Sequence, residues 1–141
     1  MFEKFFQPKS IAVIGASRTP GKVGYDVVAN LLSNSFSGTI YPVNPKADRV
    51  QGLDCYGDVT DIPGEVDLAV VAIPAKIVPD IIDQCAKKDI DSVVVISAGF
   101  KETGQKGKEL EQELARRCRE HGIRCIGPNC LGIISPPQNM N

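Results

Sequence analysis

Three glycines follow the first apolar segment of the chain in a pattern that could bind phosphate. The segment ends at Ile14 and continues as Gly15-Ala-Ser-Arg-Thr-Pro-Gly-Lys-Val-Gly24, and we expect an amphipathic helix to begin near Lys22 to Gly24. The first N–H groups of a helix have no intrahelical partner, so they readily bind anions. The spacing therefore predicts a phosphate site after the first strand.

The residue types of this segment suit that chemistry. Glycine permits a tight exit from a strand and close backbone approach to a ligand, while hydroxyl and cationic groups add donors and positive charge. The candidate phosphate ligands are Gly15, Ser17, Arg18, Gly21, Lys22, Val23 and Gly24. An ordinary strand-to-helix turn is the alternative, and the spacing departs from the G-x-G-x-x-G pattern of NAD sites.

A second candidate contact follows the next apolar run, in the order Val43-Asn44-Pro45-Lys46. NAD enzymes place an acidic residue here against the ribose hydroxyls, whereas a lysine favours a phosphorylated ribose. CoA, with its 3′-phosphate, and NADP, with its 2′-phosphate, both meet that requirement. We expect Asn44, Pro45 and Lys46 to line the site, and a solvated surface lysine is the alternative interpretation of Lys46.

Small or rigid residues also follow the later apolar runs, as Ile73-Pro74-Ala75, Ser97-Ala98-Gly99 and the segment from Gly127 to Gly132. Such residues leave room for an elongated ligand arm. They are equally typical of plain turns. Both interpretations stay open at this point.

Five short apolar runs alternate with longer amphipathic segments, which is the rhythm of βαβ units. The runs cover residues 11–14, 39–43, 68–73, 93–96 and 123–126, and buried helix faces are expected at Val27, Val28, Leu31 and Leu32, at Ile77, Ile81, Ile82 and Cys85, and at Leu110, Leu114 and Cys118. We predict a Rossmann-like, doubly wound, five-stranded parallel sheet in three α/β/α layers, most simply in strand order 3-2-1-4-5. Ligands bind such sheets beyond the carboxyl ends of the strands, where the order reverses.

Composition narrows the function further. The 141 residues suit one domain, and 16 basic against 17 acidic residues give a net charge of -1, so we expect neither nucleic acid nor a membrane as partner. The N-terminus is too polar for a signal peptide, which favours the cytoplasm. Five scattered cysteines and one histidine form no metal-ligand pattern, so we expect reduced thiols, mostly buried, and no metal site.

Four motifs in order resemble one known family. They are Phe6 to Gly24, Tyr41-Pro-Val-Asn-Pro-Lys46, Val94-Val-Ile-Ser-Ala-Gly-Phe100 and Ile126-Gly-Pro-Asn-Cys-Leu-Gly132. Together they cover essentially the whole chain and resemble the N-terminal CoA-binding domain of ADP-forming acyl-CoA synthetases, which is similar to the succinyl-CoA synthetase alpha subunit.

The resemblance implies how CoA would lie. Residues 17–23 and Lys46 would hold its phosphates and nucleotide end, residues 96–98 would follow the pantetheine, and the thiol would approach the loop of residues 127–130. This adds Ile73, Pro74, Ile96, Ser97, Ala98 and Asn129 to the candidate CoA ligands.

The resemblance also implies a reaction in which acyl-CoA, phosphate and ADP give free acid, CoA and ATP through a phosphohistidine. That histidine, and the ATP, ADP and magnesium sites, would belong to further domains or subunits. We therefore expect a CoA-binding domain over residues 1–134, a linker beginning at 135–141, and no catalytic residue here. His121 lies in a turn far from the candidate site, and Cys130 lacks a basic activator.

Other functions remain open from the sequence. They are a stand-alone CoA-binding protein, a CoA-binding domain fused to a protein lysine acetyltransferase, a regulatory module that senses CoA or NAD(H), and an NADP-dependent oxidoreductase. The last lacks an evident catalytic pair and a separate substrate domain.

Overall fold

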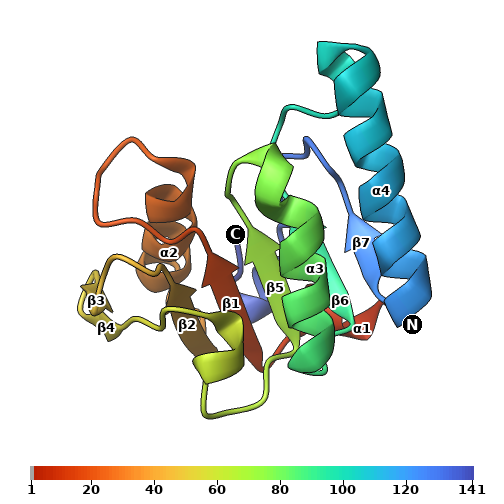
Figure 1. Ribbon diagram of the computed structural model, residues 1–141. Coiled ribbons are helices and arrows are strands. Elements are labelled where there is room, and N and C mark those ends of the chain that lie inside the picture. Colours follow the sequence, from red (N-terminus) through yellow and green to blue (C-terminus); the bar gives the residue numbers. More distant parts are fainter. Residues whose placement is uncertain (1) are drawn as a thin grey trace.

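A five-stranded parallel sheet organises the computed structural model, which describes residues 2–141 (Figure 1). Its strands are β1 (Ser10–Ile14), β2 (Thr39–Val43), β5 (Leu68–Val71), β6 (Ser92–Val95) and β7 (Arg124–Ile126). Every pairing within this sheet is parallel. The five predicted strands are confirmed, with ends that differ by one or two residues.

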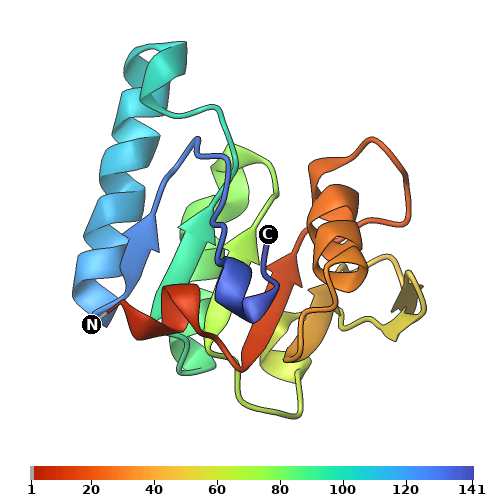
Figure 2. The same cartoon turned by 180° about the vertical axis from the view of Figure 1, so that it is seen from behind.

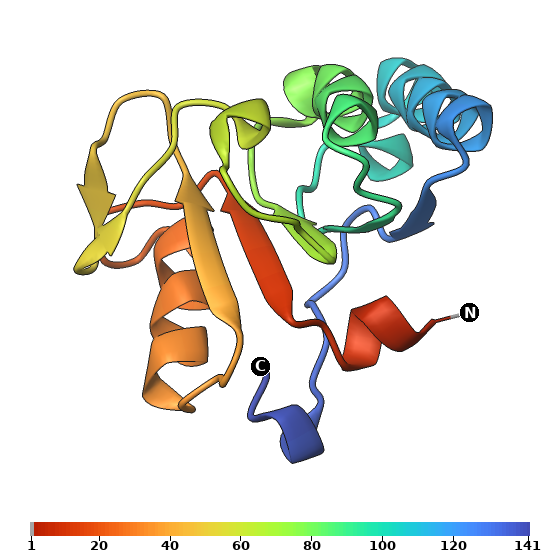
Figure 3. The same cartoon turned by 90° about the horizontal axis from the view of Figure 1, so that it is seen from below.

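Helices cover both faces of the sheet, as predicted. They are α1 (Glu3–Phe6), α2 (Val23–Ser33), α3 (Val78–Lys87) and α4 (Gln105–His121), with short 3-10 turns η1 (Val59–Asp61), η2 (Ala75–Ile77), η3 (Lys101–Thr103) and η4 (Pro136–Gln138). Figure 3 shows α3 and α4 on one face and α2 with the C-terminal segment on the other. The three-layer α/β/α architecture is confirmed.

Two residues expected on buried helix faces are exposed instead. Leu32 is 40% exposed and Ile77 is 47% exposed. Leu32 lies in the last turn of α2, and Ile77 precedes α3 as its N-cap, so neither faces the sheet as its helical spacing predicted. The other predicted positions are buried or half-buried.

The predicted strand order is wrong. The observed order is β2-β1-β5-β6-β7, or 2-1-3-4-5 when only the sheet strands are counted along the chain. Residues 44–67 hold no α-helix that could cross the α2 face to a strand outside β2; they form the antiparallel pair β3 (Arg49–Val50) and β4 (Leu53–Asp54), followed by η1. The chain then enters β5 on the other side of β1, and right-handed crossovers place α3 and α4 on the opposite face. The order thus reverses between β1 and β5.

The core lies in two layers against the sheet. All five residues of β1 are buried, because the strand is covered on both faces. Val71, Ile82 and Phe100 belong to the cluster under α3 and α4, whereas Val28 and Phe5 belong to the cluster on the α2 side. The sheet therefore has no polar face.

The C-terminal segment packs back onto the domain (Figure 2). The Ser135 hydroxyl donates a hydrogen bond to the Phe6 carbonyl at 2.8 Å, and Met140 is 4% exposed on the α2 side. These residues complete one layer of the fold. That a linker to further domains begins in residues 135–141 stays a prediction.

All five cysteines are free, but only Cys85 and Cys118 are buried, fewer than expected, because the other three lie at strand and loop edges. Burial raises the pKa of the Cys85 thiol to about 12, so this group stays protonated and inert at neutral pH. Residues 2–141 contain no group of three or more potential metal ligands. None of the helices in this range is long and apolar enough to cross a membrane.

Helix α1 offers a matched test of core packing. Phe5 is fully buried against the sheet, whereas its neighbour Phe6 is 44% exposed. We expect Phe5→Ala to lower the free energy of unfolding by about 3–5 kcal/mol through cavity formation, and Phe6→Ala by no more than about 0.5 kcal/mol. Urea denaturation measures both. Equal losses would contradict the described position of α1.

Candidate functional site

The loop from β1 to α2 is held unusually close to its surroundings. The Gly15 and Ala16 amides both donate to the Val43 carbonyl, at 3.0 and 3.2 Å, and Gly15 adopts a φ of +94°. A Cβ at Gly15 would lie 2.2 Å from the Ala72 carbonyl oxygen, and a Cβ at Gly24 would lie 1.8 Å from the Gly15 carbonyl oxygen. Only glycine lets α2 begin directly on the end of β1.

The first turn of α2 carries unpartnered donors. The Val23 and Gly24 amides have no acceptor among residues 2–141, and Lys22, the N-cap residue, makes no side-chain capping bond. Ser17 accepts from the Thr19 amide at 3.0 Å, which shapes the loop before the helix. Free N–H groups at the positive end of the helix dipole form an anion-binding arrangement.

Three cations on the segments that follow β1 and β2 have no anionic partner. Arg18, Lys22 and Lys46 are exposed, and none of them forms an ion pair within the described part of the chain. By contrast, Arg49 in the neighbouring hairpin is neutralised by Asp54 at 2.8 Å. Asp26, in the first turn of α2, and Asp48 also form no ion pair within residues 2–141, so the unpaired charge of these two segments is a net +1.

Asn44 connects the two loops that carry these cations. Its side-chain amide Nδ2 donates to the Ala16 carbonyl at 2.8 Å, and its Oδ1 accepts from the Lys46 amide at 2.8 Å. Pro45 lies exposed between Asn44 and Lys46. The structure thus brings the two candidate phosphate-binding segments together, but it engages the Asn44 side chain with the protein itself.

Ser97 makes a similar connection between the ends of β5 and β6. Its hydroxyl donates to the Ile73 carbonyl at 2.5 Å and accepts from the Ile73 amide at 3.1 Å, while its own carbonyl accepts from the Asn129 amide at 3.0 Å. Three of the predicted contact residues therefore meet where β5, β6 and β7 end. Nearby, Pro74 and Ala98 are exposed and Ile96 is half-buried.

Sequence reasoning missed Glu102, which fixes the loop after β6. Its carboxylate accepts from the Gly99 amide at 2.5 Å and from the Phe100 amide at 3.0 Å. These bonds, with that of Gly99 first, lower the pKa of Glu102. An acidic residue three positions after a glycine at a strand end was the available signal, because carboxylates commonly accept from such backbone amides.

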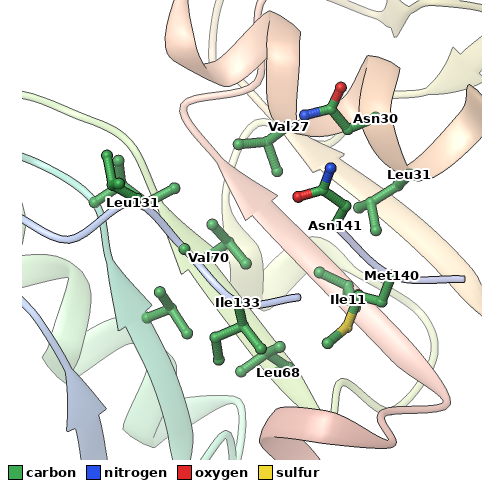
Figure 4. Close-up of a pocket in the computed structure, with 13 residues that line it drawn as sticks. Ile11, Val27, Asn30, Leu31, Leu68, Val70, Leu131, Ile133, Met140 and Asn141 are labelled. Atoms are coloured by element: carbon green, nitrogen blue, oxygen red, sulfur yellow. The ribbon is translucent and has the colours of Figure 1, made fainter. Parts of the chain in front are cut away.

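An apolar cavity of about 80 Å³, which the sequence did not predict, lies on the α2 side of the sheet (Figure 4). Aliphatic side chains from the sheet and α2 line it together with Asn30 and Asn141, and Met140 of the C-terminal segment lies across it. Ile96 and the fully exposed Leu131 also line the cavity. The cavity could not be predicted because it depends on tertiary packing: the C-terminal segment that covers it has a polar sequence, which gives no indication that it folds back onto the sheet.

His121 and Cys130 lie in structural contacts. His121 Nε2 is 2.9 Å from Asp83 Oδ1, which links α4 to α3 ahead of β7 and so at the amino end of the sheet. The Cys130 thiol contacts the Val95 carbonyl at 3.3 Å. His121 is exposed and Cys130 is half-buried.

Comparison with known proteins gives consistent matches. Residues 9–136 match the family model described as a CoA binding domain. The ADP-forming acetate–CoA ligase II of Archaeoglobus fulgidus is 52% identical over 130 residues, which cover 92% of this chain and 19% of that protein. The alpha subunit of the ADP-forming acetate–CoA ligase II of Pyrococcus furiosus is 47% identical over 141 residues, or 100% of this chain and 31% of the subunit.

Solved structures agree with these matches. The dinucleotide-forming acetyl-coenzyme A synthetase 1 of Ca. Korarchaeum cryptofilum, in complex with phosphate and ADP, superimposes with a TM-score of 0.95 at 45% identity. The match covers 100% of this chain and 30% of that one. The chain therefore spans less than a third of the length of these ligases and of this synthetase.

Gly24 provides the test of this loop. We expect Gly24→Ala to lower the free energy of unfolding by about 1–3 kcal/mol, because the added methyl group forces α2 away from the Gly15 carbonyl. Gly57→Ala is the control: its Cβ would meet only Asp61 Oδ2, at 3.9 Å, and its φ is not positive. Chemical denaturation should show the control to be neutral or stabilised by up to about 1 kcal/mol. A harmless Gly24→Ala would disprove the close contact.

Proposed function

The chain belongs to the CoA binding domain family, and from that premise we propose that it binds coenzyme A or an acyl-CoA for an ADP-forming acyl-CoA synthetase. One observation carries the proposal. Unpartnered amides of α2 and three cations without ion pairs lie on the segments that follow β1 and β2, beside the point between β1 and β5 where the strand order reverses and where ligands of doubly wound sheets bind. CoA, with a diphosphate and a 3′-phosphate, supplies the matching negative charge.

The phosphates of CoA would occupy the edge formed by β1, β2 and α2. The Val23 and Gly24 amides donate to the diphosphate, and Arg18 and Lys22 offset its charge. Lys46, on the adjacent loop, contacts the 3′-phosphate of the ribose. Charge-assisted bonds of this kind are stronger than neutral ones, so they supply both affinity and orientation.

The pantetheine arm would lie across the ends of β5 and β6. Residues 96–98, together with Ile73 and Pro74, offer small or apolar groups along this path, and the bonds of the Ser97 hydroxyl to Ile73 keep its two walls together. The thiol then reaches the β7 loop near Asn129. The site thus orients the thiol and leaves chemistry to other groups.

The complete reaction would need parts of the relatives that lie outside this chain. In our proposal, further domains or subunits supply the phosphohistidine and the ADP site, and acyl-CoA, phosphate and ADP give acid, CoA and ATP. The described carboxyl edge contains no histidine, since His121 lies at the amino end. This domain therefore binds and presents CoA without catalysing phosphoryl transfer.

Calorimetric titration with CoA, 3′-dephospho-CoA, NADP and NAD tests the proposal. We expect CoA to bind about tenfold more tightly than 3′-dephospho-CoA, a difference of about 1.4 kcal/mol, because Lys46 pairs with the 3′-phosphate. Lys46→Ala should abolish that preference. Lys87→Ala, which removes an exposed charge at the far end of α3, should keep it.

The comparison ligands give the contrary outcomes. Tight NADP binding without CoA binding would contradict the proposal and would favour an NADP-dependent oxidoreductase domain. Absence of saturable CoA binding would contradict a domain that binds CoA unaided.

A further inference from the structure

We propose that Asn44 is a positioning residue. Its carboxamide holds the Lys46 loop against the β1–α2 loop by hydrogen bonds, and in this way it sets the selectivity for the 3′-phosphate without contacting CoA. This inference rests on the proposed function and deepens it. It concerns how the β1–α2 loop and the Lys46 loop are held in a fixed position relative to each other. Sequence reasoning had placed Asn44 among the ligand contacts.

The side chain of Asn44 is committed to the protein at both ends. Nδ2 donates to the Ala16 carbonyl, and Oδ1 accepts from the Lys46 amide, each at 2.8 Å. Both bonds have good lengths for neutral amide pairs. The two bonds use one of the two Nδ2 donors and one of the two Oδ1 lone pairs, and together they fix the orientation of the carboxamide.

The backbone of Asn44 is fixed as well. Its amide donates to the Tyr56 carbonyl at 2.9 Å, and its carbonyl accepts from the Ala47 amide at 3.3 Å. The Cys55 thiol approaches the same carbonyl at 3.7 Å. Asn44 is therefore anchored to the β1–α2 loop, to its own loop and to the segment after β4.

This anchoring fixes the position of the Lys46 backbone. The bond from the Lys46 amide to Oδ1 closes a turn across Pro45, whose ring fixes one backbone angle. The Lys46 side chain itself is exposed and unpaired among residues 2–141. A fixed backbone lowers the entropy lost when a flexible lysine meets a phosphate.

Few other residues could replace Asn44. The bridge needs a donor toward Ala16 and an acceptor toward Lys46, and a carboxamide supplies both. Alanine supplies neither, whereas the serine hydroxyl accepts from the amide two residues on, more weakly than asparagine. Asn44→Ser should therefore keep part of the hydrogen bonding to the Lys46 loop that Asn44→Ala loses.

The test compares CoA with 3′-dephospho-CoA by calorimetry in the wild type, Asn44→Ala, Asn44→Ser and Asn34→Ala. Asn34, the exposed C-cap of α2 at the opposite edge, is the matched control. We expect the affinity ratio to fall from about tenfold to about twofold in Asn44→Ala, to lie between these values in Asn44→Ser and to be unchanged in Asn34→Ala. A general loss of structure would weaken both ligands alike and leave the ratio unchanged.

Amide hydrogen exchange of ligand-free protein gives a second readout that does not depend on CoA. The Lys46 amide should exchange about tenfold faster in Asn44→Ala than in the wild type, because it loses its acceptor. If the wild type does not bind CoA but the Lys46 amide exchanges faster in Asn44→Ala, the positioning role of Asn44 is supported and the proposed ligand is contradicted. An unchanged affinity ratio or unchanged Lys46 exchange in folded variants would overturn the inference, and Asn44→Ser decides it should Asn44→Ala not fold.

Discussion

The contact between the start of α2 and the end of β1 governs the rest of this structure. Gly24 lies so close to the Gly15 carbonyl that even a methyl group would collide with it. The helix therefore begins at the carboxyl edge of the sheet, and its free amides lie where the strand order reverses. Any residue that moved α2 away would separate the amides from Lys46 and from the β5 edge. The contact between Gly24 and the Gly15 carbonyl therefore determines both the packing of the backbone and the geometry of the candidate site.

Much of the fold could be predicted because it depends on local pattern. Apolar runs specify strands that are buried on both faces, and helical spacing specifies α2, α3 and α4. The strand order could not be predicted in the same way. Nothing local in residues 44–67 states on which side of β1 the chain enters β5, and that choice depends on which face the next crossover can cover.

The candidate site shows the same division. Glycine spacing and Lys46 indicated a phosphate edge, because those properties belong to single residues. The roles of Asn44, Ser97 and Glu102 depend on partners distant in sequence or on a loop conformation, so residue type alone suggested ligand contacts for the first two and nothing for the third. Met140 is buried only because the tail folds back across the sheet.

A crystal structure of this domain with CoA tests the central claim most directly. The account predicts diphosphate oxygens within hydrogen-bonding distance of the Val23 and Gly24 amides, and the 3′-phosphate against Lys46. It also predicts that Asn44 keeps its bonds to Ala16 and Lys46 in the complex. Phosphates bound at the amino edge of the sheet, or CoA seated in the apolar cavity under Met140, would contradict it.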